Sequence, residues 1–317
     1  MTGSRVVALG HYQPAKVLTN HDLAAMVDTS DEWITSRVGI KTRHLGGPDE
    51  PVDELAAHAA AKALAAAGLQ PADIDLVLVA TSTAIDRSPS MSARVAARLG
   101  MSSPAVMDIN VVCSGFTHAL ATADHAVRAG AATRALVIGA DKMGDIVDWT
   151  DRSSCVLMGD GAGAAVVVAD SGPAGRPAGI GPVLWGSVPG MGDAVRIEGT
   201  PPRFAQEGQS VYRWATTQLP PIARKVCEKA GITPEDLAAV VLHQANLRII
   251  EPVARKIGAV NAVIARDVVD SGNTSAASIP MALSKLVERG EVATGAPALL
   301  FGFGGNLSYA GQVIRCP

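Results

Sequence analysis

The chain has 317 residues, of which 48% are hydrophobic, 18% are charged and 3% are aromatic. This composition is that of a folded globular protein with a sizeable core. The net charge of −3 argues against a nucleic-acid partner. Because no apolar run approaches the roughly 20 residues that span a bilayer, we expect no membrane segment.

The N-terminus and the cysteines predict a cellular setting. The first residues contain a short apolar stretch that is typical of a strand, not of a signal peptide. The cysteines form no CxxC pair, which argues against a disulfide framework or a zinc site. We therefore expect a cytoplasmic protein with neither a metal nor a separate cofactor. The four cysteines are Cys113, Cys155, Cys227 and Cys316.

In chain order, a first strand is followed by helical patterns over residues 52–67, 91–99 and 114–130. A Gly/Pro-rich join at residues 170–182 precedes a further helix over 210–230. Apolar strands alternate with these helices, a pattern that favours an α/β fold with a mainly parallel sheet buried on both faces.

The second part of the chain repeats the first. The stretch AGLQPADIDLVLVATST, which starts at Ala67, returns as AGITPEDLAAVVLHQAN from Ala230, 163 residues later. The same shift places RALVIGAD (134–141) on PALLFGFG (297–304), while the VVCSG of NVVCSGF (110–116) matches the VVDSG of VVDSGNT (268–274) at a shift of 157. We therefore predict two pseudo-symmetric α/β halves, residues 1–171 and 172–317, layered around shared central helices.

Cys113 lies where an apolar strand meets a helix whose apolar residues recur at helical spacing from Phe116 to Val127. Gly115 would assist a sharp turn at this point. The free amides and the positive end of the helix dipole favour the thiolate there, so we expect an activated nucleophile. A packed structural cysteine would give the same local pattern, so this segment alone leaves both interpretations open.

The second half supplies partners for this cysteine. His243 follows the second copy of the strand, and Asn273 lies three positions after Asp270, which the repeat matches to Cys113. In open α/β sheets the C-terminal ends of strands line the ligand crevice. We therefore predict that Cys113, His243 and Asn273 meet between the halves as the catalytic residues.

Two glycine-rich stretches have different interpretations. Gly304 and Gly305 follow the last apolar strand, and an amide there could form an oxyanion hole with the amide of Cys113. The stretch GDGAGAAVVV (159–168) lacks the GxGxxG spacing of a nucleotide loop. Close packing of the backbone is its expected role.

Several motifs together resemble one family. They are TSDEWITSRVGIKTRH, CSGFTHAL, DWTDRSS, GDGAGAAV, HQANLRII, GNTSAASIP and FGFGG, and they span nearly the whole chain. In this combination the sequence resembles the β-ketoacyl-acyl-carrier-protein (ACP) synthase III family. The resemblance implies the thiolase-like fold, with layers in the order αβαβα, and a homodimer. Elongating synthases of this fold carry two histidines, and in this sequence Asn273 takes the position of one of them.

The resemblance also implies an activity. Cys113 would take the acyl group from an acyl-CoA, and His243 and Asn273 would hold the thioester carbonyl of malonyl-ACP during its decarboxylation. The resulting enolate would attack the acyl-enzyme and give a 3-ketoacyl-ACP that starts a fatty-acid chain. An asparagine suits this role because its amide donor, unlike that of histidine, does not depend on protonation.

Binding residues follow from the same resemblance. Trp33, stacked on adenine, would bind CoA together with Arg37 and Arg152, although a partly buried core aromatic would also explain Trp33. A basic cluster after His243 suits an acidic carrier-protein helix, although a solvated helix face is the usual meaning of such charges. The expected carrier-protein contacts are Gln244, Ala245, Asn246, Leu247, Arg248, Arg255 and Lys256, with Arg213 beside them.

Two positions depart from the family pattern. Asn306 stands where a glycine is usual, which leaves the shape of the oxyanion turn open. Ser88 is small where members restricted to acetyl primers often carry an aromatic residue, so the acyl pocket could accept longer or branched primers. A large side chain such as Met143 could refill that pocket.

Three other interpretations compete with the fatty-acid role. A family member that primes a polyketide or another secondary metabolite would use the same chemistry. A cysteine hydrolase would need neither the CoA residues Trp33 and Arg37 nor Asn273. A duplicated binding protein without catalysis would not need to retain Cys113, His243 and Asn273 together.

Overall fold

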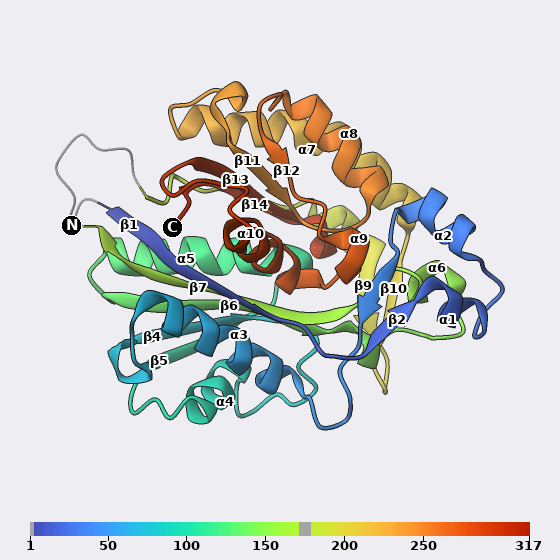
Figure 1. Cartoon of the computed structure of the whole chain (residues 1–317), viewed down its shortest axis with the longest axis horizontal. Helices are drawn as coiled ribbons and strands as arrows, with labels where there is room; N and C mark the ends of the chain where they lie inside the picture. The colour runs from blue at the N-terminus through green and yellow to red at the C-terminus, as the bar shows by residue number, and fades with distance from the viewer. Residues whose placement is uncertain (1–2, 171–178) are drawn as a thin grey trace.

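The computed structural model describes residues 3–170 and 179–317 (Figure 1). Two five-stranded sheets form the framework. From edge to edge, the first sheet consists of β1 (Gly3–Tyr12), β7 (Asp160–Asp170), β6 (Arg134–Lys142), β4 (Leu76–Ala80) and β5 (Ala105–Ile109). The second consists, in the same way, of β12 (Val263–Ile264), β11 (Ala239–Leu242), β13 (Pro297–Phe303), β14 (Tyr309–Arg315) and β8 (Leu184–Gly186).

Each sheet is mixed: two of its four strand pairings are parallel and two are antiparallel, but four of its five strands run in the same direction, so the prediction of mainly parallel sheet holds for strand direction and not for strand pairing. In the first sheet β5, β4 and β6 are parallel, whereas β7 is antiparallel to both of its neighbours, β6 and β1. The second sheet repeats this arrangement, with β12, β11 and β13 parallel and β14 antiparallel to both of its neighbours, β13 and β8. The reason is that β6 and β13 are each followed by a strand that pairs back on them without a crossover helix.

Six helices complete the layers. The helices α3 (Val52–Ala67) and α4 (Met91–Arg98) cover the outer face of the first sheet, and α7 (Gly208–Lys229) and α8 (Leu247–Ile257) cover that of the second. Between the sheets lie α5 (Gly115–Arg128) and α10 (Ser278–Glu288), packed in a core that both sheets share. The predicted αβαβα order is therefore confirmed, and it runs from bottom to top in Figure 1.

Local signals explain where the longer helices end. The predicted helices over 52–67, 91–99, 114–130 and 210–230 agree with α3, α4, α5 and α7 to within two residues at each end. Gly68 and Gly231, just after α3 and α7, have φ of +65° and +72°, a conformation that glycine adopts readily. The turns that follow begin at Pro71 and Pro234, so the repeat in the sequence is a repeat in the structure.

The turns before the two central helices correspond at the same shift of 163 residues, and the predicted shift of 157 residues was wrong for them. Val112 and Ser275 have positive φ, +47° and +50°, and each opens a short 3₁₀ turn that leads into a central helix, α5 or α10. These positions are 163 residues apart, so Cys113 corresponds to Ala276 and not to Asp270. The two sequence segments were misaligned because the second half has an additional short helix, α9 (Val268–Ser271), before its turn.

The short elements gather at one end of the layers (right in Figure 1). They are β2 (Val17–Thr19), α1 (Asn20–Ala24), α2 (Asp31–Val38), β3 (Thr42–His44), α6 (Arg152–Cys155), β9 (Val195–Glu198) and β10 (Arg203–Gln206). The predicted boundary between the halves, at 171 and 172, lies outside the described residues. No helix in the described ranges is long and apolar enough to span a membrane.

The stretch GDGAGAAVVV lies in β7 from its second residue on, and it packs against α10. A Cβ on Gly161 would come within 2.6 Å of the sulfur of Met281. The glycines therefore let the central helix approach the sheet closely, in agreement with the packing role predicted for them.

Candidate active site

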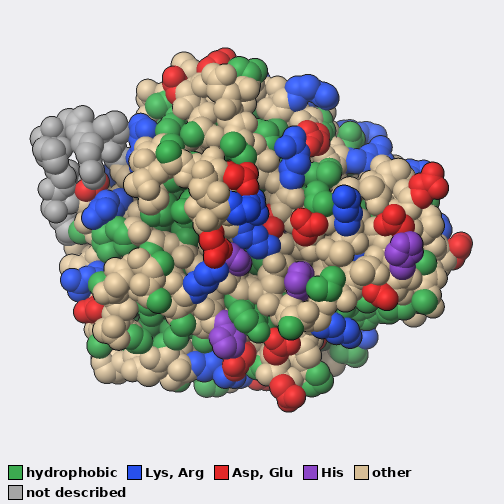
Figure 2. Space-filling model, in the orientation of Figure 1, with side chains coloured by type: hydrophobic (Ala, Val, Ile, Leu, Met, Phe, Trp, Pro, Cys, Tyr) green, Lys and Arg blue, Asp and Glu red, His purple; other side chains and the backbone are tan. Residues whose placement is uncertain are grey.

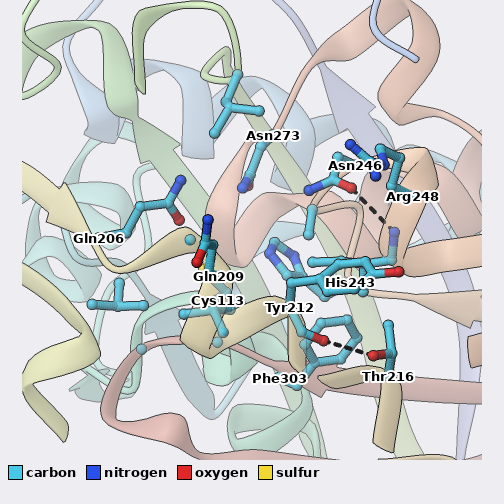
Figure 3. A pocket seen from close by; sticks show the side chains of 18 of the residues that line it. Cys113, Gln206, Gln209, Tyr212, Thr216, His243, Asn246, Arg248, Asn273 and Phe303 are labelled. Carbon is cyan, nitrogen blue, oxygen red and sulfur yellow. Dashed lines mark hydrogen bonds between the residues drawn. The ribbon is translucent and has the colours of Figure 1, made fainter. Parts of the chain in front are cut away.

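A cavity of about 690 Å³ opens at the end of the layers where the short elements gather. Cys113, His243 and Asn273 all line it, although they come from three segments far apart in the chain (Figure 3). The structure thus brings together the three residues that the sequence predicts as neighbours. The rest of the lining comes largely from β9, β10 and the first turns of α7.

Cys113 sits in the 3₁₀ turn Val112–Ser114, directly before α5. The left-handed residue of this turn is Val112, a β-branched residue for which a positive φ is unfavourable. Gly115, to which the sequence prediction assigned the sharp turn, has ordinary helical angles. The backbone strain therefore lies immediately before the nucleophile position.

The resting state of Cys113 differs from the prediction. The side chain is 8% exposed, and its burial raises the thiol pKa to about 11. The hydroxyl of Ser275 and the amides of Gly305 and Cys113 lower the pKa, but they do not offset the burial. The expected net activation by the helix terminus was therefore wrong, because desolvation of the thiolate outweighs the local donors.

This pKa predicts the pH dependence of chemical labelling. Below the pKa the thiolate fraction rises about tenfold per pH unit. Between about pH 7 and about pH 10, alkylation of Cys113 by iodoacetamide should therefore accelerate about tenfold for each pH unit. Peptide mass spectrometry against time measures the rate, and the buried Cys227, outside the cavity, serves as the internal control. A plateau near pH 8 would show that the thiol ionises much more readily than its burial implies.

His243 directly follows β11 and is 2% exposed. Burial lowers its pKa to about 3, so the ring is neutral near pH 7. Its Nδ1 lies 2.8 Å from Oγ of Ser278, and that oxygen also accepts the amide of Gln244 at 3.3 Å. Because Oγ already accepts one hydrogen bond, the hydroxyl proton is available to Nδ1. This arrangement favours the tautomer that presents Nε2–H.

Asn273 is fixed by its backbone and by its side-chain oxygen. Its N–H donates to the carbonyl of Leu157 at 2.8 Å, and its Oδ1 accepts the N–H of Ser275 at 2.9 Å. With Oδ1 engaged in the turn, the amide nitrogen is left for the cavity that Asn273 lines. The site therefore contains two neutral donors, His243 and Asn273, beside one thiol.

The turn after β13 passes close to Cys113. Gly304 has φ of +157°, and a Cβ there would lie 2.6 Å from Cβ of Cys113. The next amide, that of Gly305, hydrogen-bonds to Cys113. Asn306 is exposed with φ of +59°, a left-handed conformation that asparagine tolerates. Asparagine instead of glycine at position 306 therefore does not turn the Gly305 amide away from the sulfur of Cys113.

The three residues predicted to bind CoA form one cluster. The guanidinium of Arg152 lies 4.9 Å from the ring centre of Trp33, and that of Arg37 lies 5.9 Å from it. Arg37 lines the cavity, whereas Trp33 is half-buried and lies outside the lining. Arg152 also contacts Asp28, in an exposed ion pair that screening weakens.

The predicted carrier-protein residues divide into exposed and buried members. On α8 the apolar face packs inward, while Arg248, Arg255 and Lys256 are exposed. Arg248 and Arg213 line the cavity. Basic side chains are prominent in Figure 2 over the region where Figure 1 places α8 and α2.

Gln244 does not belong to this surface, and its assignment to carrier-protein contact was wrong. It is 1% exposed, its Nε2 donates to the carbonyl of Leu242, and its Oε1 accepts the amide of Val268. Asn246 accepts the amide of Ile249 as the N-cap of α8. Ala245, Asn246 and Leu247 are half-buried, and the first two line the cavity.

The predicted primer residues do not line the cavity of this chain. Ser88 is exposed in the loop between β4 and α4. Met143 is buried in the cluster that also contains Leu157 and Phe204, both of which line the cavity. A floor formed by Ser88 would therefore have to come from a second copy of the chain.

Sequence reasoning missed the wall of the cavity that α7 provides. Gln209, Tyr212, Arg213 and Thr216 all line it, and only Arg213 was singled out. Their spacing of three, four and seven residues was the available signal, since it places them on one helix face. Ser275 and Ser278, which contact Cys113 and His243, were likewise overlooked within the GNTSAAS motif.

Comparison with known proteins agrees with this geometry. The family models for 3-oxoacyl-ACP synthase III match residues 107–186, and residues 227–316 for its C-terminal part. A β-ketoacyl-ACP synthase III of Streptomyces avermitilis is 82% identical over 317 residues, which is 100% of each chain. Among solved structures, the priming β-ketosynthase of the R1128 polyketide pathway is 40% identical with a TM-score of 0.95, covering 99% of this chain and 96% of that one. The 3-oxoacyl-ACP synthase III of Aquifex aeolicus is 38% identical with a TM-score of 0.93, covering 99% and 100%.

Proposed function

The chain belongs to the β-ketoacyl-ACP synthase III family of condensing acyltransferases, and we propose that it joins an acyl-CoA primer to malonyl-ACP. The products are carbon dioxide, free CoA and a 3-ketoacyl-ACP that starts a fatty-acid chain. The observation that carries this proposal is the meeting of Cys113, His243 and Asn273 in one cavity.

In the first half-reaction the sulfur of Cys113 attacks the carbonyl of the acyl-CoA. A new thioester forms on Cys113, the bond to the CoA sulfur breaks, and the thiol proton ends on CoA. The amides of Cys113 and Gly305 both face the sulfur, so they are placed to stabilise the oxyanion of this step.

In the second half-reaction the neutral donors act on malonyl-ACP. The amide nitrogen of Asn273 and Nε2–H of His243 hydrogen-bond the thioester oxygen, on which negative charge develops as carbon dioxide leaves. The enolate carbon then attacks the acyl group on Cys113, and the thiolate leaves and takes up a proton from solvent. A ring with a pKa of about 3 suits this step, since it donates without carrying a charge of its own.

Adenine recognition is assigned to the cluster around Trp33. Arg152 now covers the indole, but its ion pair with Asp28 is exposed, so little free energy opposes its displacement. A planar base could then stack on the indole face, while Arg37 and Arg152 approach the phosphates of CoA. No separate cofactor enters this scheme.

The carrier protein is proposed to dock on the basic face of α8 and on Arg213. We expect Arg248→Glu to raise the KM for malonyl-ACP about tenfold or more, and to change the KM for the acyl-CoA within about twofold. The matched control is Arg134→Glu, which makes the same charge change at the exposed start of β6. Steady-state kinetics at low and high salt measure the effect. Equal KM changes in both variants, or carrier binding that does not respond to salt, would contradict the docking surface.

We also propose that the chain forms a homodimer through β5. This edge strand pairs with β4 on one side, and its side chains are all exposed or half-buried, with Met107 46% exposed. An exposed edge with apolar side chains is a site for pairing with another chain. The loop with Ser88 would then reach the partner, and sedimentation of wild type and Met107→Lys tests this.

A cytoplasmic location fits the four free cysteines.

The direct test of the proposed function is the complete reaction. Purified protein, acyl-CoA and malonyl-ACP should yield carbon dioxide and 3-ketoacyl-ACP in equal amounts. Likeness to a priming β-ketosynthase of a polyketide pathway favours one alternative, the same chemistry with another primer or carrier. A matrix of acyl-CoA primers against fatty-acid and polyketide carrier proteins separates the two. Hydrolysis of acyl-CoA without condensation would instead favour a cysteine hydrolase.

A further inference from the structure

Ser275 connects the nucleophile to the opposite half of the molecule. Its hydroxyl lies 3.7 Å from Sγ of Cys113 and also hydrogen-bonds to the carboxylate of Asp141, so its one proton is shared between the two, and the serine side chain is fully buried. Its φ of +50° is rare for a residue other than glycine. Such backbone strain persists only where the surrounding structure fixes the conformation.

Asp141 provides that fixation. This buried carboxylate, at the end of β6, accepts the amide of Ala276 through Oδ2 at 3.0 Å. Its Oδ1 accepts the amides of Ser82 and Thr83, at 2.8 and 3.1 Å, and the hydroxyl of Thr81 at 3.0 Å. One carboxylate therefore ties the loop after β4, in the first half, to the turn that carries Ser275, in the second.

The same turn orients Asn273, because the amide of Ser275 donates to Oδ1 of Asn273 at 2.9 Å. Ser275 thus contacts both a thiol and an amide with assigned roles. We propose that Ser275 is a positioning residue, which donates to the sulfur of Cys113 through its hydroxyl and orients Asn273 through its amide while Asp141 holds the turn. This inference rests on the proposed function for the roles of Cys113 and Asn273.

The charged and polar groups around the sulfur of Cys113 set the pKa of this thiol. In the described part of the chain, the titratable groups that face Cys113 are Asp141, whose charge raises the thiol pKa, and the neutral His243 in the same cavity. The hydroxyl of Ser275 opposes Asp141 by lowering that pKa. Removing the hydroxyl should therefore lower the thiolate fraction at every pH below the pKa.

Two variants separate the hydroxyl from the strained backbone. Ser275→Gly removes the hydroxyl and adopts the positive φ freely, whereas Ser275→Ala removes the hydroxyl and keeps the strain. We expect alkylation of Cys113 by iodoacetamide at about pH 8 to slow about tenfold in both variants, because a hydrogen bond to a charged group has this effect on an ionisation. The log rate against pH should shift in parallel with that of the wild type.

The outcomes are distinct. Equal slowing in both variants supports the inference, and slowing in Ser275→Ala alone overturns it in favour of backbone strain. Wild-type rates in both variants overturn it as well. Alkylation uses neither acyl-CoA nor malonyl-ACP, so its result stands apart from the proposed function. That function fails if the wild type does not acylate on Cys113, whereas the positioning role fails if acylation is normal and the Ser275 variants alkylate as the wild type does.

Discussion

Replacement of Asn273 or His243 by alanine is expected to lower condensation by about 10²–10³-fold, and to leave self-acylation of Cys113 within a few-fold of wild type. Each residue offers one neutral donor for charge that appears only during decarboxylation, and loss of such a donor typically has this effect on kcat. Intact-mass measurement of the acyl-enzyme and of labelled carbon dioxide follows the two half-reactions separately.

Asn273→Asp is the matched control for this division of labour. The aspartate keeps an oxygen for the amide of Ser275, but it replaces the donor nitrogen by an acceptor. We expect it to be at least as inactive in condensation as Asn273→Ala, with acylation retained. Equal losses in both half-reactions would mean that Asn273 and His243 act mainly on Cys113.

Substitution of Gly304 by alanine is expected to reduce acylation by at least about 10²-fold. The new Cβ would lie 2.6 Å from Cβ and 2.9 Å from Sγ of Cys113, so either the nucleophile or the oxyanion turn must move. A displacement of about 1 Å at a reacting centre is enough for a loss of this size. The rate of acyl-enzyme formation, measured by intact mass with saturating acyl-CoA, provides the readout.

Gly258→Ala controls for the backbone effect of this change. Gly258 has φ of +91°, so alanine is strained there as well, but a Cβ at that position meets nothing within 4 Å. We expect a lowered Tm and normal acylation for this variant. If Gly304→Ala acylated as fast as Gly258→Ala, the approach of the turn to Cys113 would not matter for catalysis.

The catalytic constellation could be predicted because it depends on features that the sequence states directly. His243 and Cys113 each follow the end of an apolar strand, and the internal repeat indicates that both strand ends face one crevice. The helices could be predicted for a similar reason, since apolar spacing and terminal glycines such as Gly68 set their limits.

The protonation of the site could not be predicted, because burial is a property of the packed structure. The helix terminus at Cys113 suggests a lowered pKa, yet enclosure by both halves raises it to about 11. Gln244 shows the same limit, since it adjoins His243 in the chain but turns inward to bind backbone groups. The shift of 157 residues was misleading because the inserted helix α9 has a sequence similar to that around Cys113, although it is not the structural counterpart of that turn.

The measurement that tests the account most directly is the mass of the protein after incubation with an acyl-CoA alone. We predict a single adduct of the mass of the acyl group, located on Cys113 by peptide mapping. It should be absent from Cys113→Ala, which keeps the wild-type Tm, and malonyl-ACP should discharge it as 3-ketoacyl-ACP. An adduct on Cys155, Cys227 or Cys316, or an adduct that persists in Cys113→Ala, would contradict the account.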